Sequence, residues 1–210
     1  MGHCPKVIFT CSIAVFGAPF PKAIADDYFT TPLTSYGTQK AIGELLISDY
    51  SRRRFIDGVA LRMPTVCVRS GLPNAAASGF FSNIIREPLV GLPAVLSVID
   101  TVRHWFASPR AAVGFLIQAA EMNLSVLDSR RTLTLPGSSC TVADQIEALR
   151  RVAGDKAVAM ILNVPDPAIA QIVKGWPERF DAARVIALGF TEDYSFDAII
   201  RSHIEDELGG

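Results

Sequence analysis

The chain has 210 residues, half of them hydrophobic, which is enough for one large domain or one and a half small ones. Its 20 basic and 21 acidic residues give a net charge of −1, so there is no electrostatic argument for a nucleic-acid partner. No apolar run approaches the ~20 residues that span a bilayer and no leader-like segment opens the chain, so we expect a cytoplasmic protein without a membrane partner.

The first segment with a clear pattern is KVIFTCSIAV, which ends at Phe16–Gly17. Its β-branched and apolar residues predict a buried parallel strand. Ser12 would then lie toward the carboxyl end of this strand, which is the edge where open α/β sheets bind their ligands.

A helix is predicted next, because apolar residues recur at helical spacing after a breaker and two cap candidates. The apolar residues are Ile42, Leu45, Leu46 and Tyr50, and the preceding signals are Pro32, Thr34 and Ser35.

Tyr36 and Lys40 lie on this predicted helix, one turn apart on the same face. A tyrosine is a poor base at neutral pH, because its phenol is protonated there. An ammonium one turn away favours the phenolate form electrostatically. The pair therefore has the spacing of an activated tyrosine base, although Y-x-x-x-K alone is a weak signal that occurs by chance in many helices.

The downstream elements alternate between strands and helices. Strands are expected around residues 59–68 and within 131–137, and helices within 108–122 and 142–154, the second capped by Thr141 or Ser139. The last helix, roughly residues 196–208, has apolar and acidic faces and is interpreted as a solvated surface helix.

The cysteines are scattered, with no C-x-x-C pair and no histidine at ligand spacing. They indicate neither a zinc site nor a disulfide framework, and no metal is expected. Cys11 would be oxidation-sensitive only if it were exposed. The four cysteines are Cys4, Cys11, Cys67 and Cys140.

A serine, a gap of about two dozen residues and then Y-x-x-x-K resemble the catalytic signature of the extended short-chain dehydrogenase/reductases, the NAD-dependent epimerase/dehydratase family. LRMPTVCVRSG at 61–71 resembles the family's next strand and the turn that reaches the nicotinamide. RHWFASPRAAVGFL at 103–116 resembles the segment in which an arginine faces the substrate. The segments TPLTSYGTQK, PNAAASGFFSN and HIEDELG are most similar in sequence to the family's D-erythronate dehydrogenase branch.

The resemblance implies a role for each matching position. Tyr36 would remove the proton from a substrate hydroxyl, Lys40 would support Tyr36 and bind the nicotinamide ribose, and Ser12 would hold the substrate oxygen. The cofactor would also meet Pro64 and Thr65, and the substrate would meet Arg103, with Asn74 and Ser78 as weaker candidates for the pocket wall.

Several of these positions have a plainer interpretation. Arg103 would serve equally well as a solvated charge or as the partner of a nearby acid. His104, beside Trp105, is interpreted as a packing or hydrogen-bonding histidine rather than a base. Turn chemistry explains Asn74 and Ser78 as well as substrate binding does, because their segment is rich in Gly, Pro, Ala and Ser.

The family's glycine-rich phosphate turn has no counterpart in this sequence. In the family, that turn places the pyrophosphate at a helix N-terminus. Without it, the residues present would touch only the nicotinamide end of the cofactor. The strand that carries Ser12 would also lack its usual neighbours and expose an apolar edge. We therefore expect either a fragment of a longer enzyme, which we favour, or a truncated chain that compensates by association.

The fold implied is α/β: the C-terminal part of a Rossmann-like doubly wound parallel sheet plus a small mixed substrate-binding domain. Residues 1–70 would form the partial dinucleotide-binding domain. Residues 71–210 would be mainly substrate-binding, with about 103–140 returning to the sheet.

The function implied is an NAD(P)-dependent dehydrogenase that oxidises a hydroxyl of a small sugar acid such as D-erythronate. NAD is the expected cofactor, and NADP stays open because the residue that reads the 2′ position is absent. One alternative is a nucleoside-diphosphate-sugar epimerase or dehydratase, whose partner would be a sugar nucleotide. Another is a non-catalytic remnant that acts as a binding or assembly subunit. A homodimer through the Tyr36 helix, with Gly43 and Ile47 at the contact, is also implied.

Overall fold

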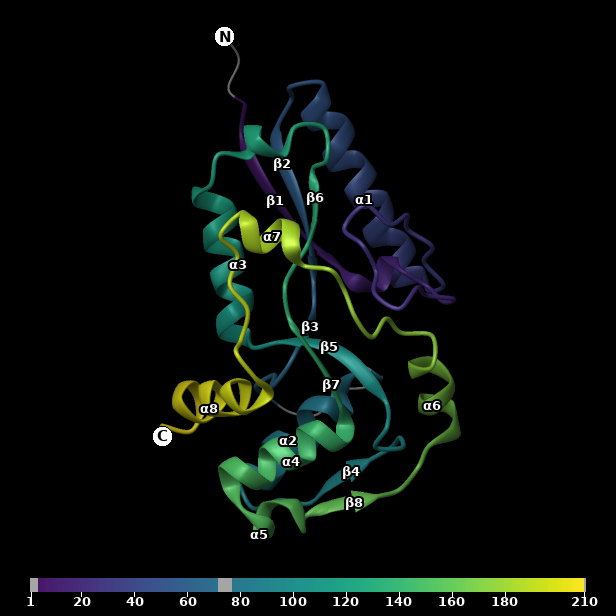
Figure 1. Ribbon diagram of the computed structural model, residues 1–210, viewed down its shortest axis with the longest axis vertical. Helices are drawn as coiled ribbons and strands as arrows, with labels where there is room; N and C mark the ends of the chain where they lie inside the picture. The colour runs from purple at the N-terminus through teal and green to yellow at the C-terminus, as the bar shows by residue number, and fades with distance from the viewer. Residues whose placement is uncertain (1–3, 72–76, 210) are drawn as a thin grey trace.

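A computed structural model describes residues 4–71 and 77–209, and it has an elongated shape built from two packed regions (Figure 1). In the first half of the chain the elements are β1 (Lys6–Ser12), the 3-10 helix η1 (Ile13–Val15), α1 (Ser35–Arg52), β2 (Asp57–Met63), β3 (Thr65–Val66), α2 (Gly79–Leu89), β4 (Ala94–Leu96) and β5 (Arg103–Ala107). The second half contains α3 (Pro109–Glu121), η2 (Leu124–Leu127), β6 (Thr132–Thr134), β7 (Ser138–Thr141), α4 (Val142–Ala153), α5 (Asp155–Val158), β8 (Ile161–Asn163), α6 (Pro167–Val173), α7 (Ala183–Ala187) and α8 (Phe196–Glu207).

The upper region is a parallel sheet in the order β1-β2-β6. Its register places Cys11 beside Arg62 and Ser12 beside Met63. Helix α1 lies on one side of the sheet and α3 on the other (Figure 1). The predicted parallel α/β arrangement is confirmed, and Ser12 is the last residue of β1.

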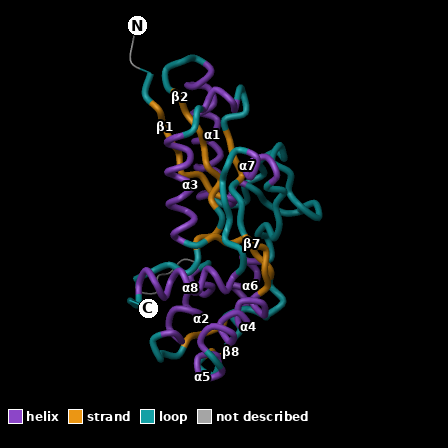
Figure 2. Tube along the Cα trace, turned by 60° about the vertical axis from the view of Figure 1, so that its left-hand side comes forward, coloured by secondary structure: helices purple, strands orange, loops and turns teal. Residues whose placement is uncertain are grey.

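The lower region holds two further small sheets, β3-β5-β7 and β4-β8. Strand β5 runs parallel to β3 and antiparallel to β7, whereas the chain from α3 to β6 rejoins the upper sheet. Helices α2, α4, α5 and α8 gather here, well separated from the β1–β2 pair (Figure 2). The buried side chains form two hydrophobic clusters, one around Leu61 and Phe115 and the other around Phe81 and Ile200.

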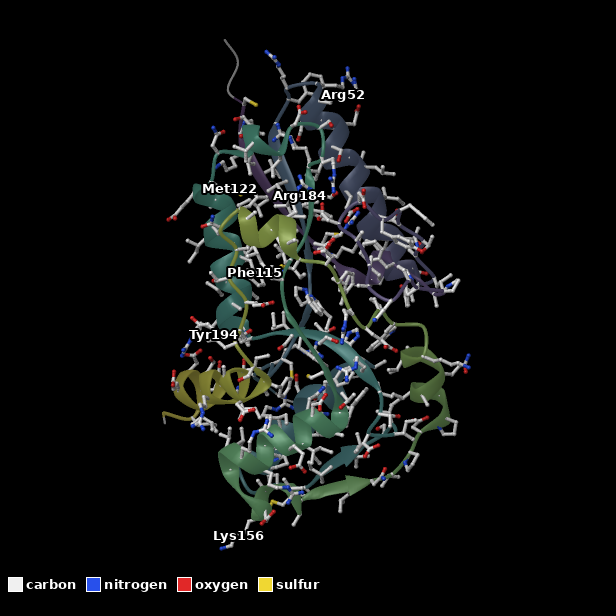
Figure 3. The ribbon with its side chains drawn as sticks, viewed as in Figure 1. Arg52, Phe115, Met122, Lys156, Arg184 and Tyr194 are labelled. Atoms are coloured by element: carbon white, nitrogen blue, oxygen red, sulfur yellow. The ribbon has the colours of Figure 1, made fainter. Side chains whose placement is uncertain are left out.

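The ends of the molecule are marked by charged surface residues. Arg52, the last residue of α1, and Lys156, in α5, lie at opposite ends of the long axis (Figure 3). Among residues 4–71 and 77–209, no helix is both long enough and apolar enough to cross a membrane.

The strand predicted around 59–68 is divided into β2 and β3, which belong to different sheets. The later predicted elements are confirmed, with one difference of interpretation for the last helix. Helix α4 is capped by Thr141, whose hydroxyl accepts from the Asp144 N–H while the Asp144 carboxylate accepts from the Thr141 N–H. Helix α8 begins after Ser195 and buries Phe196, Ile199 and Ile200. The interpretation of α8 as a solvated surface helix was therefore incomplete, since one of its faces is part of the lower core.

Helix α1 is confirmed, but its predicted apolar stripe faces outward. The side facing the sheet buries Gly37, Glu44 and Ser51 instead. Gly43 faces the Phe9 ring of β1, and it lines a hollow together with Ile47 and the stripe residues Leu46 and Tyr50. Strand β1 is correspondingly less buried than expected, with only Cys11 fully buried, because in the described chain it has a strand neighbour on one edge. The exposed stripe consists of Ile42, Leu45, Leu46 and Tyr50.

Candidate active site

The first turn of α1 docks on the backbone that follows β1. The Ser12 hydroxyl accepts a hydrogen bond from the Ala14 N–H at 3.1 Å and caps η1. The Thr34 hydroxyl accepts from the Gly37 N–H at 3.0 Å and caps α1. A Cβ on Gly37 would lie 2.1 Å from the Ala14 carbonyl oxygen, so only glycine allows this close approach. The fold thus brings the Ser12 turn against the segment that carries Tyr36.

Lys40 lies one turn after Tyr36 and is held at the sheet edge. Its Nζ donates to the Thr10 carbonyl at 2.7 Å, and it lies 5.5 Å from the centre of the Tyr36 ring and 5.0 Å from that of Phe9. An ammonium has three donors, so a hydrogen bond to the strand leaves others for a ligand. Tyr36 is 54% exposed, which leaves its phenol accessible.

A buried ion pair lies behind these residues, between α1 and β2. The Arg62 guanidinium donates to both oxygens of the Glu44 carboxylate, from Nε at 2.7 Å and from Nη2 at 2.8 Å. The Cys11 Sγ donates to Glu44 Oε1 at 3.0 Å. Sequence reasoning missed this cluster, although a charged residue inside the apolar run VALRMP and an acid one turn beyond Lys40 were visible signals.

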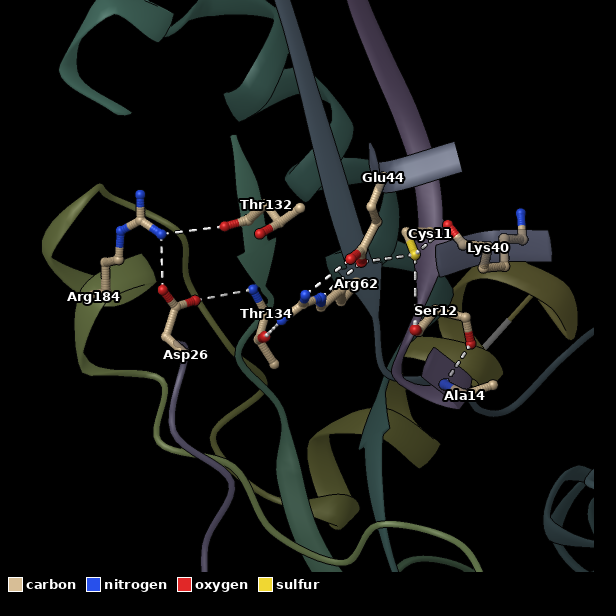
Figure 4. Close-up of polar contacts among 10 residues, drawn as sticks. All are labelled: Cys11, Ser12, Ala14, Asp26, Lys40, Glu44, Arg62, Thr132, Thr134 and Arg184. Carbon is tan, nitrogen blue, oxygen red and sulfur yellow. Dashed lines mark hydrogen bonds and ion pairs between the residues drawn. The ribbon is translucent and has the colours of Figure 1, made fainter. Parts of the chain in front are cut away.

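The network continues from Arg62 across the sheet (Figure 4). Arg62 Nη1 donates to the Thr134 hydroxyl at 3.4 Å, and the Thr134 N–H donates to Asp26 Oδ1 at 3.3 Å. Asp26 also binds Arg184 of α7, with 2.7 Å between Oδ2 and Nη1. Polar contacts therefore connect α1 with all three strands and with the loop that follows β1.

Pro64 lies between β2 and β3, just past the strand end that pairs with Ser12, and Thr65 begins β3. Pro64 is buried, and the Thr65 hydroxyl is 2.7 Å from His104 Nε2. His104 Nδ1 is 2.9 Å from the Pro177 carbonyl, and the ring stacks on Phe81. Burial lowers the pKa of His104 to about 4, so the ring is neutral near pH 7. The interpretation of His104 as a packing and hydrogen-bonding residue is confirmed.

Arg103 begins β5 and is tied to the lower region. Its Nη1 donates to the Ser139 carbonyl at 3.0 Å, and its Nη2 lies 3.7 Å from Asp144 Oδ2. The backbone hydrogen bond at Thr141 is the main cause that lowers the pKa of Asp144, and the charge of Arg103 adds to it. Within the described ranges, no hydrogen bond joins Arg103 to Ser12, Tyr36 or Lys40. The plainer interpretation, an arginine paired with a nearby acid, is thus part of the structure.

The two weaker candidates differ in what the structure shows. Ser78 precedes α2 and accepts a hydrogen bond from Arg69 Nη2 at 3.2 Å. Asn74 lies outside the described residues.

Three of the four cysteine thiols are buried, and all four are free. Burial is the main cause that raises the pKa of Cys67 and Cys140 to about 12 and that of Cys11 further. Cys11 is only 3% exposed, so the condition for its oxidation is not met. Within residues 4–71 and 77–209, no group of three or more His, Cys, Asp and Glu residues is arranged to hold a metal ion.

Comparison with known sequences places close relatives along nearly the whole chain. It is 50% identical over 206 residues to a D-erythronate dehydrogenase of Cupriavidus necator, covering 98% of this chain and 64% of the relative. It is 44% identical over 206 residues to a D-erythronate dehydrogenase of Haemophilus influenzae, covering 97% of this chain and 65% of the relative. No family model matches the chain. The chain therefore spans just under two thirds of the length of the curated relatives it matches.

Comparison with solved structures gives the same fold. A structure described as the nucleoside-diphosphate-sugar epimerase from Agrobacterium tumefaciens is 61% identical, with a TM-score of 0.96, covering 99% of this chain and 60% of that one. A GalE-like L-threonine dehydrogenase from Cupriavidus necator shares the fold at 22% identity, with a TM-score of 0.84, covering 96% of this chain and 65% of that one. The predicted Rossmann-like fold and the resemblance noted in the sequence are confirmed.

Proposed function

We propose, from the premise that this chain is homologous to D-erythronate dehydrogenases and has the extended short-chain dehydrogenase/reductase fold, that it oxidises a hydroxyl of a small sugar acid with NAD or NADP. D-erythronate is the proposed substrate. One observation carries the proposal: Tyr36 and Lys40 lie on the first turns of α1, packed against the turn after Ser12, in a chain 50% identical to an enzyme of that name.

The roles follow from the chemistry of each side chain. The Tyr36 phenolate takes the proton of the substrate hydroxyl. The C–H bond on the carbon that carries this hydroxyl breaks in the same step, and the hydroxyl becomes a carbonyl. Lys40 stabilises the phenolate through its positive charge, because its ammonium lies beside the Tyr36 ring. The Ser12 hydroxyl can donate to the substrate oxygen while it accepts from the Ala14 N–H.

The residues present fit the nicotinamide end of the cofactor. Tyr36 and Lys40 offer a half-exposed hydroxyl and an ammonium at the carboxyl end of parallel strands, where α/β folds bind nucleotides. Lys40 would hold the ribose, and Pro64 and Thr65 would pack beside the ring. When bound, NAD or NADP supplies the acceptor for the hydride that leaves the substrate carbon. NAD is the proposed cofactor.

The central test is Tyr36→Phe, which removes only the phenol oxygen. Because this sequence has no counterpart of the glycine-rich phosphate turn, the chain is joined at its N-terminus to a nucleotide-binding segment that carries one. This protein is incubated with D-erythronate and either NAD or NADP, and the reduced nicotinamide is followed by its absorbance. The loss of a general base is expected to lower turnover by about a thousandfold. Tyr50→Phe is the matched control, because Tyr50 is exposed on the same helix and outside the site. Equal rates for the two variants, both as fast as the unsubstituted protein, would remove Tyr36 from catalysis.

Arg103 is proposed to bind the substrate carboxylate, since a guanidinium can clamp a carboxylate with two parallel hydrogen bonds. Arg103→Ala is then expected to raise KM for D-erythronate much more than it lowers kcat. Arg150→Ala serves as the control, because Arg150 is an exposed arginine that pairs with Glu147 of the same helix α4 at 3.1 Å. A lower melting temperature with unchanged KM would show that Arg103 is only the tether to Ser139 and Asp144.

A second candidate is a nucleoside-diphosphate-sugar epimerase, favoured by the description of the 61% identical structure. It is distinguished by offering sugar nucleotides in place of D-erythronate and measuring their interconversion. Turnover of neither substrate class by the folded protein with a nucleotide-binding segment joined to it would leave the third interpretation, a non-catalytic binding or assembly subunit.

A further inference from the structure

The side of α1 that faces the sheet is held by a buried charge pair. The side chains of Glu44 and Arg62 are 5% and 6% exposed. Both carboxylate oxygens are bound by the same guanidinium, at 2.7 and 2.8 Å. A two-point contact of this kind fixes orientation as well as distance, because the planar fork must meet the carboxylate in one plane.

Stability alone does not explain a buried pair at this place. Removing two charges from water costs several kcal/mol per ion in general, and replacing such pairs with apolar residues of similar volume is often neutral or stabilising. An apolar contact would, however, let α1 rotate or slide more easily, since its strength depends little on direction. A one-residue slip of a helix moves each side chain by about 1.5 Å along the axis and about 100° around it.

The pair is coupled directly to the Lys40 turn. Glu44 lies one helical turn after Lys40. The Cys11 thiol connects the two turns, because its Sγ lies 3.0 Å from Glu44 Oε1 and 3.7 Å from the Lys40 carbonyl oxygen. Cys11 and Arg62 are neighbours in the β1–β2 register, so the pair joins α1 to both strands at the level of Ser12.

We propose that Glu44 and Arg62 are positioning residues that set the height and rotation of α1, and thereby place Tyr36 and Lys40 relative to Ser12. The inference rests on the proposed function for its catalytic consequence, but the placement of Tyr36 can be measured without turnover. Arg62 also donates to the Thr134 hydroxyl of β6, and the Thr134 N–H donates to Asp26 (Figure 4). These contacts fix the position of α1 relative to all three strands of the parallel sheet.

The test is the double variant Glu44→Met/Arg62→Met, which removes both charges and keeps similar volume. The chain Met1–Gly210 is labelled with 3-fluorotyrosine, and its four tyrosine resonances are recorded by ¹⁹F NMR, with that of Tyr36 assigned from Tyr36→Phe. We expect the double variant to stay folded, with the Tyr36 resonance shifted or broadened and that of Tyr194 unchanged. Turnover of D-erythronate is expected to fall about tenfold to a hundredfold in kcat. KM should change less than about threefold, since the lost interaction acts in the transition state.

The matched control is Arg151→Met/Asp197→Met, which removes an exposed pair between α4 and α8. It should leave the Tyr36 resonance and kcat unchanged. If the Glu44/Arg62 double variant proves unfolded, Glu44→Asp is examined instead, since it keeps both charges and shortens the side chain by one methylene. An unchanged Tyr36 resonance in the folded variant would overturn the proposal. If the unsubstituted chain joined to a nucleotide-binding segment turns over no substrate, the proposed function fails, while the ¹⁹F spectra still decide whether the pair positions Tyr36.

Discussion

Helices α1 and α8 have opposite surfaces. Helix α8 buries Phe196, Ile199 and Ile200 and directs acids such as Asp197 toward arginines on neighbouring helices. Helix α1 buries Glu44 and exposes its apolar stripe. The two helices show that the same fold places one element by apolar burial and the other by directional polar contacts and a close glycine approach.

The difference matches what each helix carries. Helix α8 must only close the lower core, for which burial of apolar area is sufficient. Helix α1 carries Tyr36 and Lys40, whose distances to a bound substrate must be reproducible. Burial alone specifies such distances poorly, whereas a bidentate ion pair and a backbone contact at Gly37 specify them well.

The largest expected effect compares one apolar truncation on each helix. Ile200→Ala in α8 removes a side chain with 0% exposure and should lower the free energy of unfolding by about 2–5 kcal/mol. Leu45→Ala in α1, where the side chain is 72% exposed, should change it by no more than about 0.5 kcal/mol. Urea denaturation of both variants measures the difference.

The same experiment can contradict the idea that the two helices are held in place by different kinds of contact. A loss for Leu45→Ala as large as that for Ile200→Ala, and one that depends on protein concentration, would show that a second copy covers the outer face of α1. The proposed homodimer would then account for the exposed stripe, and α1 would be placed by burial after all.

The sequence predicted the elements better than it predicted their faces. The strand that ends at Ser12, the α1 helix and the α4 cap at Thr141 depend on local patterns, and all three were confirmed. The buried Glu44 was not predicted, because apolar spacing identifies a helix without showing which side meets the sheet. Its partner Arg62 is 18 residues away on β2, and only the packing of α1 against β2 brings the two together. The roles of Pro64, Thr65 and Arg103 stay proposals, since they depend on a bound ligand.

A second prediction concerns pH and the core that α8 closes. Burial lowers the pKa of His104 to about 4, below the ~6.5 of an unfolded chain. The unfolded chain therefore binds the proton first, so stability is complete above about pH 6.5 and is lost as the pH falls toward 4. Between pH 7 and 5 the expected loss from His104 is about 2 kcal/mol.

The measurement is urea denaturation of the chain and of His104→Gln at both pH values. Burial also lowers the pKa of His203 on α8, which adds to the trend in both proteins. The variant should be less stable at pH 7 but should lose about 2 kcal/mol less on acidification. Equal losses in the two proteins would mean that folding does not lower the pKa of His104.

The smallest effect compares the caps of the two helices. The Thr34 hydroxyl accepts from the Gly37 N–H at 3.0 Å, and the Ser195 hydroxyl accepts from the Ala198 N–H at 3.2 Å. Thr34→Ala and Ser195→Ala should each cost about 1 kcal/mol of stability, because each leaves an N-terminal donor of its helix without a partner.

Their effects on turnover should differ, since the Thr34 cap orders the turn that holds Tyr36 and the Ser195 cap orders only the lower core. A lower kcat for Thr34→Ala with an unchanged kcat for Ser195→Ala would show that geometry at the start of α1, and not general stability, limits the reaction. Equal effects on kcat would instead mean that the two helices differ in how they pack but not in how they influence the reaction.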